Sequence, residues 1–118
     1  MNRIEDLACA AIGREALTLR VLAQDLLRQQ PDASSWRRPA STDPRVLAVA
    51  AALTELLALR TGQRPPSWTA LVGPLSEPLF LLRAAEKFPR LRKLCEEEAP
   101  APLRTRCILA PPNFLEFA

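Results

Sequence analysis

The chain has 118 residues, the length of one domain, and its 48% hydrophobic and 25% charged residues fall in the range of globular proteins. It contains no histidine and no tyrosine, so the side chain that most enzymes use for proton transfer, and many use to bind metals, is missing. The net charge of +3 permits nucleic-acid binding without requiring it.

Two helices are expected in the first 30 residues. Asn2 is the predicted N-cap of the first, with Glu5 as its capping-box partner, and Gly13 is a candidate end. A strongly periodic helix follows over Arg14–Gln30 and stops at Pro31. Its apolar stripe consists of Leu19, Leu22 and Leu26, with Leu27 beside it.

The most apolar helix is predicted after a polar loop over residues 31–42, in which Trp36 is a candidate anchor. Asp43 is its N-cap and Pro44 its first residue, and Gly62 supplies the stop after Thr61. Few of its positions are polar, so we expect it to be the central, most buried helix. Its broad apolar face contains Val46, Val49, Leu53, Leu56 and Leu57.

Prolines punctuate the remaining residues, 63–118. The pattern predicts a short apolar turn at 70–72, a helix opened by Ser76-Glu77-Pro78 that runs to about Lys87, and a helix from Pro89 to Glu98. One further turn is expected at 103–106, and Ile108-Leu109 is too short to predict a strand. We therefore expect one all-α domain over residues 1–118, a compact bundle of about five to six helices with Pro-rich connections and an extended apolar C-terminal tail. Its parts are 1–30, 43–62 and 63–118.

The three cysteines, Cys9, Cys95 and Cys107, are odd in number and lack C-x-x-C spacing. We therefore expect no disulfide framework and no metal site, but reduced, partly buried thiols in a cytoplasmic protein. The longest apolar-rich stretch, Val46–Leu59, is interrupted by Glu55 and is too short to span a bilayer, and no signal peptide is evident. No cofactor and no membrane association are expected.

Aromatic residues stand where they can either fix the fold or bind a partner. Trp36 and Trp68 lie in Pro-flanked connections, and each is either a plug that holds a loop on the helices or an exposed anchor. Phe114, Leu115 and Phe117 make the chain end apolar. They fold back on the core or pack into a groove on another chain, and the sequence leaves both open.

Basic residues gather in two regions. The first region is Arg37-Arg38 in the first loop, and the second is Arg90, Arg92 and Lys93, followed by Arg104 and Arg106. Together they could form a phosphate-binding surface on one side. The acidic run Glu96-Glu97-Glu98 weakens its field, and mixed charge on a helix is most often a solvated face.

Short motifs follow one another over the last two-thirds of the chain. A helix ends at Gly62; later come Pro66-Ser67-Trp68, Leu75-Ser76-Glu77-Pro78 with Leu79-Phe80, Pro102-Leu103-Arg104-Thr105-Arg106-Cys107-Ile108 and Asn113-Phe114-Leu115. This series resembles a family of small bacterial helical antitoxin-like proteins, related to the C-terminal regions of some helix-turn-helix regulators. The resemblance implies a non-enzymatic protein that acts beside a toxin, in some cases one similar to a nucleotidyltransferase.

Residues and resemblance together predict a non-enzymatic protein-binding module that masks a cognate partner. The residues predicted to bind the partner are Trp68, Phe80, Arg104, Arg106, Phe114, Leu115 and Phe117. The alternative is a small DNA-associated regulator that uses Arg90, Arg92 and Lys93, although residues 14–30 read as one long helix rather than a helix-turn-helix. A homodimer is compatible with either.

Overall fold

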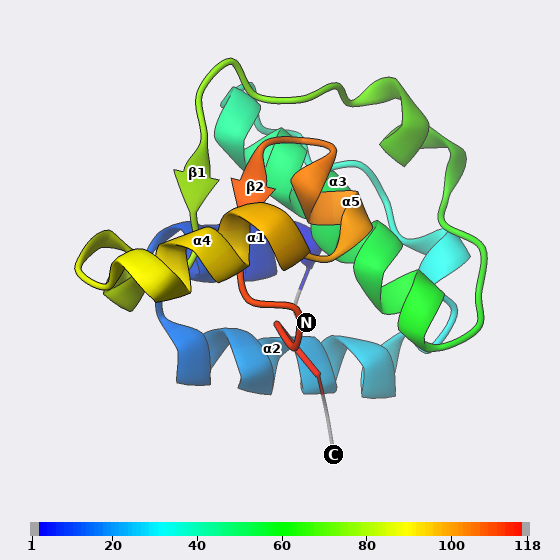
Figure 1. Cartoon of the computed structure of the whole chain (residues 1–118). Coiled ribbons are helices and arrows are strands. Elements are labelled where there is room, and N and C mark those ends of the chain that lie inside the picture. Colours follow the sequence, from blue (N-terminus) through cyan, green and yellow to red (C-terminus); the bar gives the residue numbers. More distant parts are fainter. Residues whose placement is uncertain (1–2, 117–118) are drawn as a thin grey trace.

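Helix α3 (Pro44–Arg60) runs through the centre of the protein in a computed structural model that describes residues 3–116 (Figure 1). Its start matches the prediction, because the Asp43 carboxylate accepts a hydrogen bond from the Arg45 backbone N–H at 2.9 Å. Gly62 follows the helix with a φ of 69°, a conformation that glycine adopts without strain. Ten of the helix residues, from Ala48 to Ala58, are buried, which confirms α3 as the central helix.

Helices α1 (Ile4–Ile12) and α2 (Ala16–Gln29) form the N-terminal part, where α1 packs against α3 and α2 against α1. The N-cap of α1 is Arg3, whose backbone N–H donates to the Asp6 carboxylate at 2.9 Å. The prediction that Glu5 is the capping-box partner is therefore wrong, and the predicted N-cap, Asn2, lies outside the described residues. Helix α2 begins two residues later than predicted, because the chain turns at Arg14 with a φ of 58°.

The expected helix over residues 76–87 is wrong. Instead, strand β1 (Leu79–Phe80) pairs in parallel with β2 (Ile108–Leu109), and the 3-10 turn η3 (Arg83–Glu86) follows β1. The Leu79 N–H donates to the Cys107 carbonyl at 2.9 Å, and the Leu81 N–H donates to the Leu109 carbonyl at 3.0 Å. These bonds satisfy the backbone of the extended segment where Leu81 and Ile108 become buried in the main core.

The remaining elements are the 3-10 helices η1 (Ala33–Ser35) and η2 (Ser67–Leu71) and the α-helices α4 (Pro89–Glu98) and α5 (Ala101–Arg104). Residues 3–116 thus form five α-helices with proline-rich connections, which confirms the all-α bundle, with one two-residue strand pair added. None of these helices has both the length and the apolar character needed to cross a membrane.

Two separate clusters of buried side chains hold the fold together. The main core joins α1, α2 and α3 with Trp36, Leu81, Leu103 and Ile108. A small core lies between η3, α4 and β2 and consists of Ala85, Cys95, Ala99 and Leu109. All three thiols are free, but Cys9 is exposed rather than partly buried, and burial raises the pKa of Cys95.

The chain end is not extended over its described part. Phe114 and Leu115 are half-buried against the main core. The Arg60 guanidinium donates to the carbonyl of Phe114 and, at 3.4 Å, to that of Pro112, which fixes this segment beside α3. For residues 111–116 the structure therefore favours docking on the chain's own core, while Phe117 lies outside the described residues.

Candidate functional site

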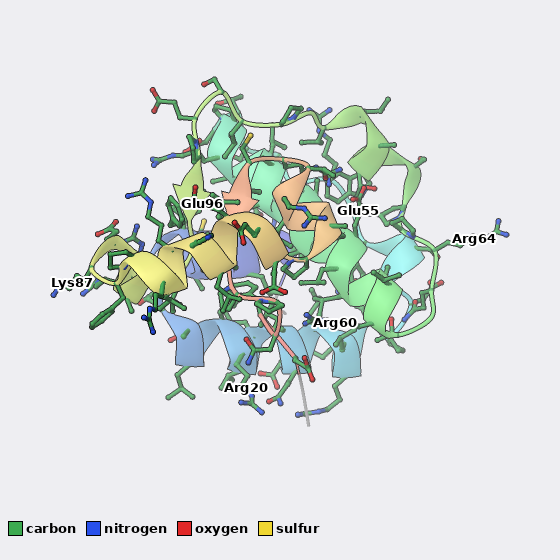
Figure 2. The ribbon with its side chains drawn as sticks, viewed as in Figure 1. Arg20, Glu55, Arg60, Arg64, Lys87 and Glu96 are labelled. Atoms are coloured by element: carbon green, nitrogen blue, oxygen red, sulfur yellow. The ribbon has the colours of Figure 1, made fainter. Side chains whose placement is uncertain are left out.

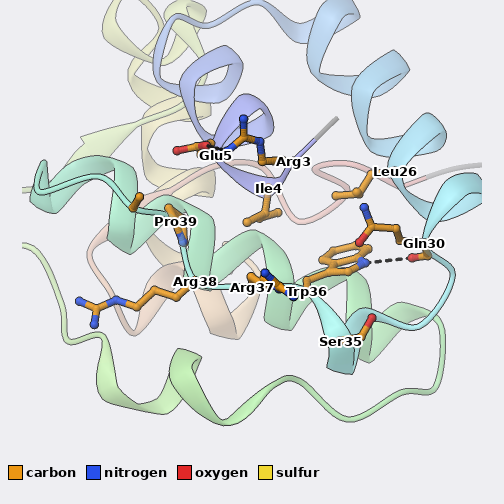
Figure 3. A pocket seen from close by; sticks show the side chains of 11 residues that line it. Arg3, Ile4, Glu5, Leu26, Gln30, Ser35, Trp36, Arg37, Arg38 and Pro39 are labelled. Carbon is orange, nitrogen blue, oxygen red and sulfur yellow. Dashed lines mark hydrogen bonds and ion pairs between the residues drawn. The ribbon is translucent and has the colours of Figure 1, made fainter. Parts of the chain in front are cut away.

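A pocket of about 450 Å³ opens between the start of α1, the end of α2 and the segment after η1 (Figure 3). This volume lies within the range of roughly 300–1,000 Å³ that is usual for ligand sites. Its apolar lining comes from Ile4, Leu26, Trp36, Pro39 and Ala40, and its polar lining from Arg3, Glu5, Gln30, Ser35, Arg37 and Arg38. An apolar floor with charged side chains around it suits an amphipathic ligand.

Both tryptophans hold the wall of this pocket in place. Trp36 is buried, and its indole N–H donates to the Gln30 carbonyl at 2.9 Å (Figure 3). The carbonyl of Trp36 in turn accepts from the indole N–H of half-buried Trp68 at 2.8 Å. Of the two roles that the sequence allowed, each tryptophan therefore has that of a plug that holds a loop on the helices. Trp68 contributes to the pocket indirectly, by fixing Trp36.

Gln63, just beyond α3, fastens the loop that carries Trp36. Its side-chain oxygen accepts from the Ala33 N–H at 2.7 Å, and its amide nitrogen donates to the Pro31 carbonyl at 2.7 Å. The same nitrogen donates to the Thr61 hydroxyl at 2.8 Å. Gln63 thus bonds both a backbone N–H and a backbone C=O of the loop before the pocket and ties this loop to the end of α3. These bonds give the pocket a fixed frame.

The arginines around the pocket differ in how they are paired. Arg3 forms an ion pair with Glu5 at 3.2 Å. Arg37 and Arg38 are exposed, and neither makes an ion pair with any residue in the range 3–116. Figure 3 shows the Arg38 side chain extending away from Trp36. Two guanidinium groups at the pocket are therefore available to an anionic ligand.

Most of the residues predicted to bind a partner serve the fold instead. Phe80 is half-buried beside the small core, and the Arg92 guanidinium lies 5.1 Å from the centre of its ring. Arg104 is exposed on α5 and donates to the Glu97 carbonyl at 2.7 Å. Phe114 and Leu115 contact the main core. The structure therefore does not bring the predicted set together as one exposed surface.

Arg106, which the sequence predicted to bind the partner, is buried within the fold. The residue is 7% exposed, and its guanidinium donates two hydrogen bonds to the Glu55 carboxylate of α3, at 2.7 Å and 2.9 Å (Figure 2 labels Glu55). It also donates to the backbone carbonyls of Val72, Thr69 and Pro102. A guanidinium with all of these partners can be buried, because its charge and its donors are satisfied.

We expect this ion pair to make stability depend on acidic pH. Burial raises the pKa of Glu55, but hydrogen bonds from Arg106 and Thr69 and the charge of Arg106 outweigh it, so the pKa lies below its usual value. A carboxyl whose pKa is lowered in the folded state stabilises the fold above its unfolded pKa, and this is lost as pH falls through the folded pKa.

Melting temperatures measured between about pH 6 and about pH 3 should therefore fall more steeply for the native chain than for Glu55→Gln. Glu86, whose pKa is also lowered, by hydrogen bonding to Arg14, is present in both proteins and cancels in the comparison. Parallel curves would contradict the assignment.

The predicted nucleic-acid residues lie on α4, where acidic neighbours engage two of them. Arg92 pairs with Glu96 at 3.5 Å, and Lys93 pairs with Glu97 at 3.9 Å. Arg90 is exposed. These pairs, one helical turn apart, are typical of a solvated helix face and leave less charge for phosphate groups than the sequence suggested.

Several exposed apolar residues were not identified from the sequence. Leu17 and Val21 lie four residues apart on α2 and fall outside its buried stripe, which the helical period could have shown. Phe88 precedes α4 and Leu71 ends η2, and no local pattern marks either as exposed. Within residues 3–116, the exposed large hydrophobic side chains are Leu17, Val21, Leu59, Leu71 and Phe88.

Searches with this chain match no family model, no curated protein and no solved structure. The antitoxin-like resemblance of residues 56–115 thus stays a prediction.

Proposed function

We propose that this chain is a non-enzymatic binding module that holds a cognate protein through the pocket beside Trp36. The observation that carries the proposal is the combination of an apolar floor, a frame fixed by the Trp36, Trp68 and Gln63 hydrogen bonds, and arginines that have no acidic partner within the described chain. A site whose frame is already ordered loses less conformational entropy on binding.

The chemistry of the lining supports binding rather than turnover. The charged lining residues are three arginines and one glutamate, and Glu5 is paired with Arg3. The hydroxyl of Ser35 donates to the Asp32 carbonyl at 2.7 Å, which is a turn contact. No lining residue is a nucleophile next to a base.

The resemblance suggests what the partner is. It implies a protein that acts beside a toxin, in some cases one similar to a nucleotidyltransferase, so the proposed role is that of an antitoxin-like or accessory protein. Trp68 and Arg106, which belong to the motifs of the resemblance, hold the fold here. The partner contact would then fall on the pocket and on exposed apolar side chains such as Leu71.

Co-expression with the protein encoded by the adjacent gene tests the proposal. We expect one complex in size-exclusion chromatography with light scattering, and we expect Ala40→Trp, which fills the pocket from an exposed position, to abolish it. Ala101→Trp places the same side chain at an exposed position of α5 that does not line the pocket and is the matched control.

Two results would count against the proposal. A monomer that ignores that protein at high concentration would remove the binding role. A complex that forms equally well with Ala40→Trp would place the contact elsewhere on the chain.

A further inference from the structure

The segment that borders the pocket, residues 37–42, leaves its backbone hydrogen-bonding groups unused. It forms neither helix nor strand, and no backbone N–H or C=O in it is bonded to another residue of the described range. Pro39 is buried and fixes the middle of the segment, while Arg37, Arg38, Ala40 and Thr42 are exposed. Its unpaired C=O and N–H groups, with no donor at Pro39, make a backbone edge that can bond to an extended peptide.

The charged side chains beside this backbone edge favour a ligand with negative charge. The pocket is lined by Arg3, Arg37 and Arg38 against a single carboxylate, that of Glu5. Because Glu5 is already paired with Arg3, the free positive charge is that of the two adjacent arginines. A guanidinium binds a carboxylate through two parallel hydrogen bonds, so an acidic side chain is the complement.

The apolar floor of the pocket favours a ligand that also carries a bulky apolar side chain. Ile4, Leu26 and Trp36 form one contiguous apolar surface under the arginines, because all three line the same pocket of about 450 Å³. A bulky aliphatic or aromatic side chain that leaves water for this surface contributes binding free energy in proportion to the apolar area it buries. The backbone edge beside it can receive the flanking peptide groups.

We propose that the pocket recognises a short, extended, acidic peptide segment of the partner protein. One bulky apolar side chain of that segment enters between Ile4, Leu26 and Trp36, and a neighbouring Asp or Glu pairs with Arg37. The inference rests on the proposed protein-binding function and specifies its ligand. The unused backbone edge is the reason for a peptide rather than a small molecule.

Selection from a displayed library of random linear heptapeptides, with the full chain as bait, tests this inference. We expect enriched peptides to carry Asp or Glu within two residues of a Leu, Ile, Phe or Trp. Fluorescence anisotropy of their dye-labelled synthetic forms then measures binding to the native chain, in which the Trp68 hydrogen bond that fixes Trp36 is intact.

Binding should weaken by about five- to tenfold in Arg37→Glu, because the change replaces an attractive charge by a repulsive one at a partly exposed site. Arg64→Glu makes the same charge change at an exposed residue outside the pocket, which Figure 2 shows pointing away from the molecule, and should bind as the native chain does. Higher salt should weaken binding to the native chain more than to Arg37→Glu.

The inference is overturned if no peptide is enriched, if enriched peptides lack an acidic residue, or if Arg37→Glu binds them unchanged. Circular dichroism establishes that Arg37→Glu is folded, and Arg37→Gln provides a neutral second variant. A co-expressed partner that still binds Arg37→Glu while the peptides fail would leave the binding module standing and remove only this pocket chemistry.

Discussion

Leu53→Asp is expected to unfold the protein. Leu53 lies in α3 with no exposed surface, among side chains of the main core. The substitution removes a buried apolar side chain and places a carboxylate where no partner is available, which costs at least about 4–5 kcal/mol. A domain has a stability of about 5–15 kcal/mol, so one such change removes much or all of it.

Thermal unfolding followed by circular dichroism measures this effect, and α3 provides its own control. Leu59 lies in the same helix but is 66% exposed, so Leu59→Asp introduces the same charge without burying it. We expect Leu59→Asp to keep the helical spectrum and a melting temperature close to the native one. A cooperative, native-like transition for Leu53→Asp would show that α3 is not the centre of the fold.

Arg106→Leu is expected to destabilise the protein by about 3 kcal/mol, because it leaves the half-buried carboxylate of Glu55 without its counter-charge. It also deprives the carbonyls of Thr69 and Val72 of their donors. These carbonyls lie in and after η2, so the loss should loosen the segment that carries Trp68. Urea unfolding measures the difference.

Two further variants separate the loss of the ion pair from other destabilising effects of the substitution. Arg104→Leu makes the same change two residues earlier at an exposed position and should cost no more than about 1 kcal/mol. Combining Arg106→Leu with Glu55→Leu should cost less than the sum of the two single changes, since neither charge is then left alone. Strict additivity would mean that Glu55 and Arg106 do not act together.

The sequence predicts the elements whose signals are local. Asp43-Pro44 and Gly62 bracket α3 within one residue of its observed bounds, and the apolar periods identify α1, α2 and α4. The pair β1–β2 could not be predicted in this way. Each strand has two residues, and the reason for their extended form is a partner 29 residues away along the chain.

The site was less predictable than the fold, because exposure depends on tertiary packing. Among many arginines, nothing local distinguishes Arg106, which is buried on Glu55, from Arg37, which faces solvent. The paired arginines beside Trp36 were noticed, but their convergence with Ile4 and Leu26 needs the turn at Arg14 that brings α1 and α2 together. Side chains from three segments form the pocket, and only folding joins them.

The division of the buried side chains into two cores has a consequence for local unfolding. Helix α4 is held chiefly by η3 and by the small core, whereas the frame of the pocket belongs to the main core. A unit with few buried contacts opens at a lower free energy than the whole domain. The region around α4 can therefore detach and reclose while the arginine-lined pocket stays assembled, so ligand capture and partial unfolding need not compete.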